Sequence, residues 1–231
     1  MDPAIVNPSA TSAAVLQRLP SARAAVTRRL LVVAVAGVIT ALGVGNLLIL
    51  GLHVWASAAS IPSTGSMSGV QNFHTVDDHL WRGGRPTEAG YAALAAAGVK
   101  TIVDLRAESN VTVHEDRIGS LGMELVQIPI RDGQTPTEDQ VDRFLGTVRN
   151  SAGTIFVHCM AGVGRTGTMV AAYLVEVKGV SPTDAWRHNL SVGPPSLEQL
   201  AFVSNIDEPN ILVTALSRVL DAPRRLWTYV K

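Results

Sequence analysis

The stretch Val157-His158-Cys159-Met160-Ala161-Gly162-Val163-Gly164-Arg165-Thr166-Gly167 contains the single cysteine of the 231-residue chain. The β-branched and aromatic residues 154–157 predict a buried strand, and the apolar run 165–177 predicts a helix. Glycines at this junction allow a tight turn and bring backbone N–H groups close to a ligand. A glycine-rich turn that enters a helix N-terminus binds anions, because unpaired N–H groups and the helix dipole point at the charge. The stretch therefore predicts a phosphate-binding loop, which also stabilises a thiolate at Cys159.

The same residues resemble the signature loop of the cysteine-dependent protein tyrosine phosphatases, in which His-Cys is followed by five residues, Arg, and Ser or Thr. The Ala-Gly and Arg-Thr-Gly within the loop are most similar to the dual-specificity branch. The resemblance implies that Cys159 is the nucleophile and that Arg165 clamps two phosphoryl oxygens. It also implies that Thr166 bonds the departing sulfur and that His158 orients the loop. The loop residues implied to bind the phosphate are Met160, Ala161, Gly162, Val163, Gly164 and Arg165.

Cleavage of a phosphate ester also requires a proton on the leaving oxygen, which a carboxylic acid near the loop can supply. The run 129–136 follows a predicted strand over 125–130 and precedes a predicted helix over 137–148. Members of the family carry an aspartate in this region, so the resemblance implies that Asp132 is the general acid. An aspartate that merely caps the strand-to-loop turn is the alternative.

The fold expected from the sequence is α/β, with a central, mostly parallel sheet flanked by helices as in dual-specificity phosphatases. Predicted strands over 101–106 and 125–130 alternate with predicted helices over 88–97 and 113–121, a pattern that favours parallel strands. Ligands of such sheets bind beyond the carboxyl ends of the strands, where the loop of Cys159 falls. A final helix over 211–220 has an apolar stripe that we expect to pack in the core.

The N-terminal part predicts a single transmembrane helix. Residues 30–55 contain no charged side chain, and at ~1.5 Å per residue they form a helix of ~39 Å, enough to cross a bilayer. We expect residues 1–29 to be flexible, 56–71 to be a linker, and 72–231 to form the phosphatase domain. Arginines precede the span and none follows before Arg82, so the positive-inside rule predicts a signal-anchor with a cytoplasmic N-terminus and an extracytoplasmic phosphatase domain. A cleaved signal peptide that releases a secreted domain is the alternative.

Composition restricts the partners. Lys+Arg and Asp+Glu both total 19, which gives no indication of a nucleic-acid partner. No metal ion or cofactor is expected, because Arg165 and the loop amides would supply the electrostatic stabilisation. The sequence does not decide the roles of three side chains. Arg82 and Arg85 either face the phosphate or pair structurally, and Gln199 either positions the hydrolytic water or faces solvent.

The substrate expected is a phosphorylated protein carrying phosphotyrosine, phosphoserine or phosphothreonine. Phosphatases of inositol lipids that resemble this loop often carry lysines where Met160 and Val163 stand, and here both side chains are apolar. This difference favours a single phosphate over a polyanionic head group. Two alternatives stay open: a phospholipid monoester, such as phosphatidylglycerophosphate or a phosphoinositide, and a phosphate-binding pseudophosphatase.

Overall fold

The computed structural model describes residues 22–58, 65–108, 112–206, 210–222 and 225. The chain forms two compact units that divide between Val44 and Gly45, and the second unit contains the α/β fold. Its strands are β1 (His74–Thr75), β2 (Leu80–Gly83), β3 (Val99–Arg106), β4 (Glu124–Ile130) and β5 (Thr154–His158). The helices of the chain are α1 (Ala22–Ala58), α2 (Glu88–Ala96), α3 (Thr112–Ser120), α4 (Glu138–Asn150), α5 (Gly164–Glu176), α6 (Pro182–Val192), α7 (Leu197–Ser204) and α8 (Ile211–Leu220).

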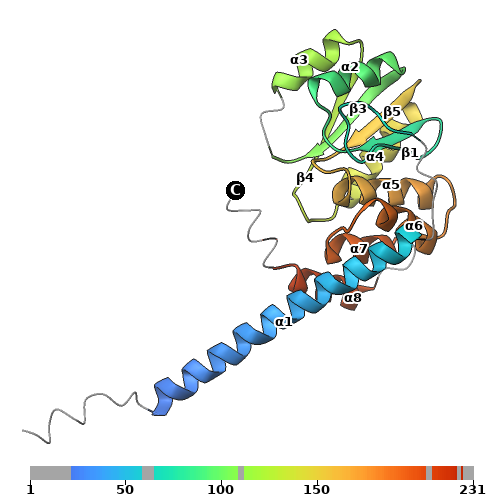
Figure 1. Ribbon diagram of the computed structural model, residues 1–231. Coiled ribbons are helices and arrows are strands. Elements are labelled where there is room, and N and C mark those ends of the chain that lie inside the picture. Colours follow the sequence, from blue (N-terminus) through green and yellow to red (C-terminus); the bar gives the residue numbers. More distant parts are fainter. Residues whose placement is uncertain (1–21, 59–64, 109–111, 207–209, 223–224, 226–231) are drawn as a thin grey trace, which may run out of the picture. The chain divides into compact units, whose positions relative to one another are not determined.

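The five strands form one mixed sheet in the order β1-β2-β5-β3-β4 (Figure 1). Strands β2, β5, β3 and β4 run parallel, and only the short β1 is antiparallel to its neighbour. The mostly parallel sheet predicted from the sequence is therefore confirmed. Val157 of the middle strand pairs with Arg82 of β2 and Val103 of β3. This register places Cys159, the residue after β5, at the carboxyl edge in the centre of the sheet.

Helices cover both faces of the sheet, because alternate strand residues point to opposite sides. Ile155 and Val157 of β5 face α4 and α5, while Phe156 between them faces α2 and α3. The cluster on the first face includes Phe144, Leu145 and Val148 of α4 and Met169, Val170 and Tyr173 of α5. The cluster on the second face includes Tyr91 and Leu94 of α2 and Ile118 of α3. Two apolar layers thus hold the middle strand rigidly beneath the loop of Cys159.

Polar caps start the helices where the sequence indicates. Thr87 Oγ1 accepts from the Gly90 N–H at the start of α2, and Ser181 Oγ accepts from the Asp184 N–H at the start of α6. Ser196 forms a reciprocal capping box at the start of α7. These caps fix the first turns of the helices relative to the loops that precede them.

Helix α1 begins at Ala22, eight residues before the predicted span and inside the segment expected to be flexible. Alanine and arginine favour helix, which explains the extension over 22–29. Residues 1–21 lie outside the described chain, as do residues 59–64 of the predicted linker. The stretch Ala24–Ala56 is long and apolar enough to cross a membrane, a property that a signal sequence shares.

Helix α8 differs from expectation in the direction of its apolar stripe. Ile211, Leu212, Leu216 and Val219 are 60–83% exposed, whereas Ser217 and Asp221 are 7% exposed. The helix packs on α7 through its polar side: Asp221 Oδ2 accepts from the N–H of Glu198 at 2.7 Å. The prediction that this stripe packs in the core is therefore wrong.

Candidate active site

Cys159 lies where β5 turns into α5 and is 3% exposed. The N–H of Gly162 donates to Cys159 Sγ at 3.3 Å, so the loop folds back over the sulfur. Val163, the N-cap residue of α5, makes no side-chain cap hydrogen bond. No side chain at the cap therefore competes with an anion for the first N–H groups of the helix. The predicted turn from strand to helix is present, and it directs a donor at the thiol.

Two glycines leave no room for a side chain: Gly162 in the loop and Gly167 in the first turn of α5. Gly162 has a φ of +77°, and a Cβ there would lie 2.3 Å from the carbonyl carbon of Gly83. A Cβ on Gly167 would lie 1.6 Å from Asn189 Oδ1. The loop is thus pressed against the end of β2 on one side and against α6 on the other, which fixes its shape from outside.

Arg165 is 2% exposed and held by groups from two different loops. Its Nη1 donates to both carboxylate oxygens of Glu108, at 3.0 and 2.8 Å, and to the carbonyl of Ile130 at 3.0 Å. Its Nη2 lies 3.3 Å from Asp132 Oδ1. These contacts fix the plane of the guanidinium, a requirement for bidentate recognition of phosphoryl oxygens.

Glu108 is a site residue that sequence reasoning missed. It follows β3 by two residues, and β3 pairs in parallel with β5. The carboxyl ends of parallel neighbours meet at one edge of a sheet, so an acid just beyond β3 comes close to the loop beyond β5. That topological signal could have identified Glu108, since the strand itself was recognised.

Asp132 lies on the loop between β4 and α4, residues 131–137, which we call the acid loop after the role predicted for Asp132. Its side chain is 64% exposed. The loop is anchored directly behind it. Ser196 Oγ donates to the carbonyl of Gly133 at 2.7 Å, and Gln199 Nε2 donates to the carbonyl of Gln134 at 3.1 Å. The structure therefore places Asp132 next to Arg165 and leaves its carboxylate open to solvent.

Gln199 does not face solvent, so that alternative from the sequence is wrong. Gln199 is 2% exposed, and its Oε1 accepts from the N–H of Ser196 in the capping box of α7. The same amide reaches the acid loop through Gln134, and a Cβ on Gly164 would lie 2.3 Å from its Oε1. Gln199 thus joins α7, the acid loop and the start of α5.

His158 lies fully buried beneath the loop, with Nδ1 3.0 Å from the carbonyl oxygen of Cys159. Burial lowers the pKa of His158, although Asp104, 3.9 Å away, opposes the shift. The imidazole is therefore neutral near pH 7, and its Nδ1–H donates to that carbonyl. Asp104 is itself paired with Arg106 at 2.6 Å. Thr166 Oγ1 has no hydrogen-bond partner in the described residues, and the resting sulfur accepts from Gly162 instead.

Arg82 and Arg85, whose roles the sequence does not decide, occupy different environments. Arg82 is 0% exposed, and its Nη2 donates to the carbonyl of Gly162 at 2.8 Å. The side chain of Arg85 is exposed, while its N–H donates to the carbonyl of Met160 at 2.9 Å. Arg82 therefore supports the loop from inside the domain, and Arg85 lies at the rim near Met160, which is 50% exposed.

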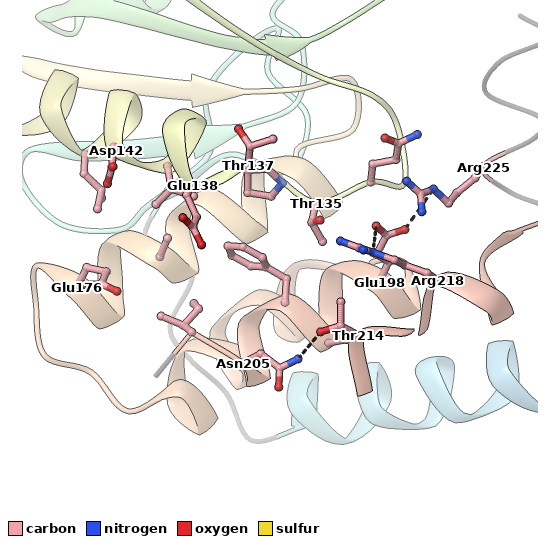
Figure 2. Close-up of a pocket in the computed structure, with 18 of the residues that line it drawn as sticks. Thr135, Thr137, Glu138, Asp142, Glu176, Glu198, Asn205, Thr214, Arg218 and Arg225 are labelled. Carbon is pink, nitrogen blue, oxygen red and sulfur yellow. Dashed lines mark hydrogen bonds and ion pairs between the residues drawn. The ribbon is translucent and has the colours of Figure 1, made fainter. Parts of the chain in front are cut away.

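A cavity of about 670 Å3 is lined by residues 134–137 of the acid loop and by side chains of α4, α7 and α8 (Figure 2). Figure 2 shows Thr135 of that loop and Glu138 of α4 on one side, with Glu198 of α7 and Arg218 of α8 on the other. Burial raises the pKa of Glu198, although Arg225 and Arg218 oppose the shift. Neither Cys159 nor the arginine of its loop lines this cavity, so it is separate from the candidate active site.

Comparisons with known proteins find relatives of this chain. The chain is 40% identical over 102 residues to the probable NAD kinase 2, chloroplastic, of Oryza sativa subsp. japonica, covering 41% of this chain and 10% of that protein. It is 39% identical over 90 residues to the dual specificity protein phosphatase CDC14A of Mus musculus, covering 38% of this chain and 14% of that protein. The chain thus spans about a tenth to a seventh of the length of these relatives.

Solved structures share the fold at lower identity. Tk-PTP in its active form is 23% identical with a TM-score of 0.53, covering 62% of this chain and 99% of that chain. The catalytic core of the PP-IP phosphatase SIW14 from S. cerevisiae is 20% identical with a TM-score of 0.53, covering 67% and 97%.

A family model described as "DSP-PTPase phosphatase fused to NAD+ Kinase" matches residues 54–205. The matched range includes β1 to α7 and therefore every candidate site residue described above. The match extends over more than half of the chain. The chain therefore belongs to this family of dual-specificity-type phosphatases, within the cysteine-dependent protein tyrosine phosphatase superfamily.

Proposed function

We propose that this chain hydrolyses phosphate monoesters of proteins, at phosphotyrosine, phosphoserine or phosphothreonine, through a phosphocysteine at Cys159. The observation that carries the proposal is the convergence on one sheet edge of a buried thiol, a fixed guanidinium and an open carboxylate. Cys159 accepts from a loop N–H, and Arg165 lies 3.3 Å from Asp132. These are the nucleophile, the electrostatic clamp and the acid that phosphoryl transfer to a thiolate requires.

In the first step, Cys159 Sγ attacks phosphorus while the bond from phosphorus to the ester oxygen breaks. Asp132 transfers its proton to that oxygen, so the alcohol or phenol leaves neutral. Arg165 and the loop N–H groups stabilise the charge on the equatorial oxygens, because they are already oriented before the substrate binds. The product of this step is a phosphocysteine together with an Asp132 carboxylate.

In the second step, water attacks phosphorus and the bond between sulfur and phosphorus breaks. The Asp132 carboxylate accepts a proton from the water, which returns the acid to its starting state. Inorganic phosphate leaves, and Cys159 is again a thiolate. Gln199 fixes the acid loop during both steps through its bond to Gln134, so the same carboxylate can act in each direction.

Apolar residues at the rim support a substrate with one phosphate. Met160 is 50% exposed, and neither it nor Val163 carries a charge for a second phosphate group. The relative named dual specificity protein phosphatase supports a protein substrate. The second candidate is a phospholipid monoester, favoured by the apolar helix Ala24–Ala56, which would hold the domain near lipid. Intact Cys159 and Arg165 argue against a pseudophosphatase.

The deciding experiment is turnover by the full chain in detergent micelles with EDTA present. The substrates are a phosphotyrosine peptide, a phosphoserine peptide and vesicles containing phosphatidylglycerophosphate. We expect turnover of the peptides and none by Cys159→Ser. Preference for the vesicles would move the function to lipid processing, and absence of turnover on all three would favour a binding module.

The acid is tested by its dependence on the leaving group. Asp132→Asn should slow hydrolysis of a phosphoserine peptide by about 100-fold, within the range for loss of general acid catalysis, and slow an activated aryl phosphate much less. Asp139→Asn, an exposed carboxylate in the first turn of α4, is the matched control. Equal losses on both substrates would assign the proton to another group.

We also propose that α1 is a signal-anchor, with the N-terminus in the cytoplasm and the catalytic unit on the extracytoplasmic side of the membrane. The basis is the asymmetry of arginines, with Arg28 and Arg29 directly before the uncharged residues 30–55 and none after them until Arg82. A reporter that is active only in the cytoplasm, fused after Lys231, should be inactive. An active reporter would reverse the orientation.

A further inference from the structure

Arg82 is a fully buried cation directly behind the loop of Cys159. It is 0% exposed on β2, the strand that pairs with β5. Its Nη2 donates to the carbonyl of Gly162 at 2.8 Å and lies 3.4 Å from the carbonyl oxygen of Val163. Both acceptors are backbone groups of the predicted phosphate loop. The side chain therefore contacts the loop from the interior of the domain, opposite the solvent.

These two contacts also determine where neighbouring N–H groups point. In a trans peptide the C=O and the following N–H are antiparallel. Since Arg82 holds the carbonyls of Gly162 and Val163, the N–H groups of Val163 and Gly164 point away from Arg82. Arg82 thus turns the amides of the loop outward, which is the orientation that an anion in the loop requires.

The positive charge of Arg82 has no carboxylate partner within the described part of the chain. Its Nε and Nη1 are buried and make no hydrogen bond there. Its titratable neighbours include two histidines, His74 and His188. Burial and the charge of Arg82 lower the pKa of both, that of His188 to about 4, so both are neutral near pH 7.

Burial lowers the pKa of Arg82 to about 10, and the negative charge of Cys159 opposes this shift. Arg82 therefore stays protonated at neutral pH, even though a buried cation without a counter-charge is costly. The groups that hold it are the two loop carbonyls that accept from its Nη2.

We propose that Arg82 is a positioning residue: it holds the carbonyls of Gly162 and Val163 from inside the domain, so that the loop N–H groups face Cys159 Sγ and the phosphate before substrate binds. This inference rests on the proposed phosphocysteine mechanism for its role in turnover. Arg82 does not touch the phosphate in this assignment. It acts through the loop, which distinguishes it from Arg165.

The test is the rate of alkylation of Cys159 by iodoacetamide against pH, using the full chain in detergent micelles. Cys159 is the only cysteine, so labelling reports on this thiol alone. Arg82→Met should slow alkylation at acidic pH about tenfold, because loop N–H groups that are no longer held outward stabilise a thiolate less. Arg82→Lys keeps a donor for the loop carbonyls and should keep most of the parental profile. Arg117→Met removes an exposed arginine of α3, 44% exposed, and should change nothing.

A parental profile in Arg82→Met would overturn the proposal, and so would equal shifts in Arg82→Met and Arg82→Lys. Should neither variant fold, Arg82→Gln is measured instead, because its amide can donate to only one of the two loop carbonyls. Its alkylation should be slower than that of the parent, and a parental profile would overturn the proposal. Alkylation requires no turnover, so the proposal is tested separately from the phosphatase activity.

Discussion

Glu108 holds Arg165 through both of its carboxylate oxygens, which lie 3.0 and 2.8 Å from Nη1. The interaction joins the loop after β3 to the first turn of α5. It fixes the guanidinium before a phosphate arrives, which reduces the reorganisation required in the transition state.

We therefore expect Glu108→Ala to lower kcat/KM on an aryl phosphate about tenfold, equivalent to ~1.4 kcal/mol of transition-state stabilisation. Glu124→Ala, an exposed carboxylate at the start of β4, is the matched control and should leave kcat/KM unchanged. A parental kcat/KM in Glu108→Ala would show that Arg165 is positioned without this carboxylate.

Gly167→Ala should destabilise the fold by about 2 kcal/mol, because the new Cβ would meet Asn189 Oδ1. Asn189 is 1% exposed, and neither polar atom of its amide has a partner in the described residues. Removing that amide in Gly167→Ala/Asn189→Ala should recover most of the loss. Urea unfolding of the two single variants and the double variant measures the coupling. If the losses of the two single variants add up in the double variant, a collision between the new Cβ and Asn189 is not the cause.

Asp77 should make the stability of the protein depend on acid pH. Partial burial alone would raise the pKa of Asp77, but hydrogen bonds from Lys178, Tyr173 and the N–H groups of Leu80 and His79 lower it to about 2. A carboxyl whose pKa is lowered in the folded state stabilises the fold at pH values above the ordinary pKa of an aspartate. It loses that contribution as the pH falls toward 2.

Asp77→Asn should therefore lower the free energy of unfolding by about 1 kcal/mol at pH 7, because solvent screens part of the interaction, and by less as the pH approaches about 2. Asp78→Asn at the neighbouring position is the control. Chemical unfolding at a series of pH values gives both curves. A difference that is constant across the series would assign the effect to packing instead of charge.

The apolar stripe of α8 should contribute little to stability within one molecule. Leu216 is 60% exposed, so Leu216→Ala should change the free energy of unfolding by less than about 0.5 kcal/mol. The same substitution at Leu94, which is 0% exposed in α2, should cost about 3 kcal/mol. Similar losses at the two positions would show that the stripe is covered in solution.

The sequence predicted those features whose cause is local. Cys159 and Arg165 are separated by five residues, so a single turn between a strand and a helix determines their relation. Thr87 and Ser196 precede the helices they cap by one residue, which also makes them recognisable. Alternation of strands and helices was sufficient to predict a mostly parallel sheet, because parallel strands need long crossovers.

Features that depend on distant contacts were missed or left open. Arg82 contacts Gly162 across 80 residues, and Arg165 contacts Glu108 across 57. No local pattern distinguishes such residues from surface charges. The sequence around Gln199 is that of an ordinary helix residue and does not indicate its hydrogen bond to the carbonyl of Gln134. In α8 the helical period reveals a stripe, but it does not reveal which side faces the domain.

The strand order has a consequence for how the chain is made. β5 completes the sheet by entering between β2 and β3, which are synthesised long before it. A nascent chain that ends before Thr154 leaves two strand edges open toward an empty position, and open edges invite pairing with other chains. Among the strands that the structure describes, the one that leads into Cys159 is thus the last to be synthesised and the one that closes the sheet. Any truncation that removes the nucleophile by removing β5 removes the fold as well, so a loss of chemistry alone requires a point substitution.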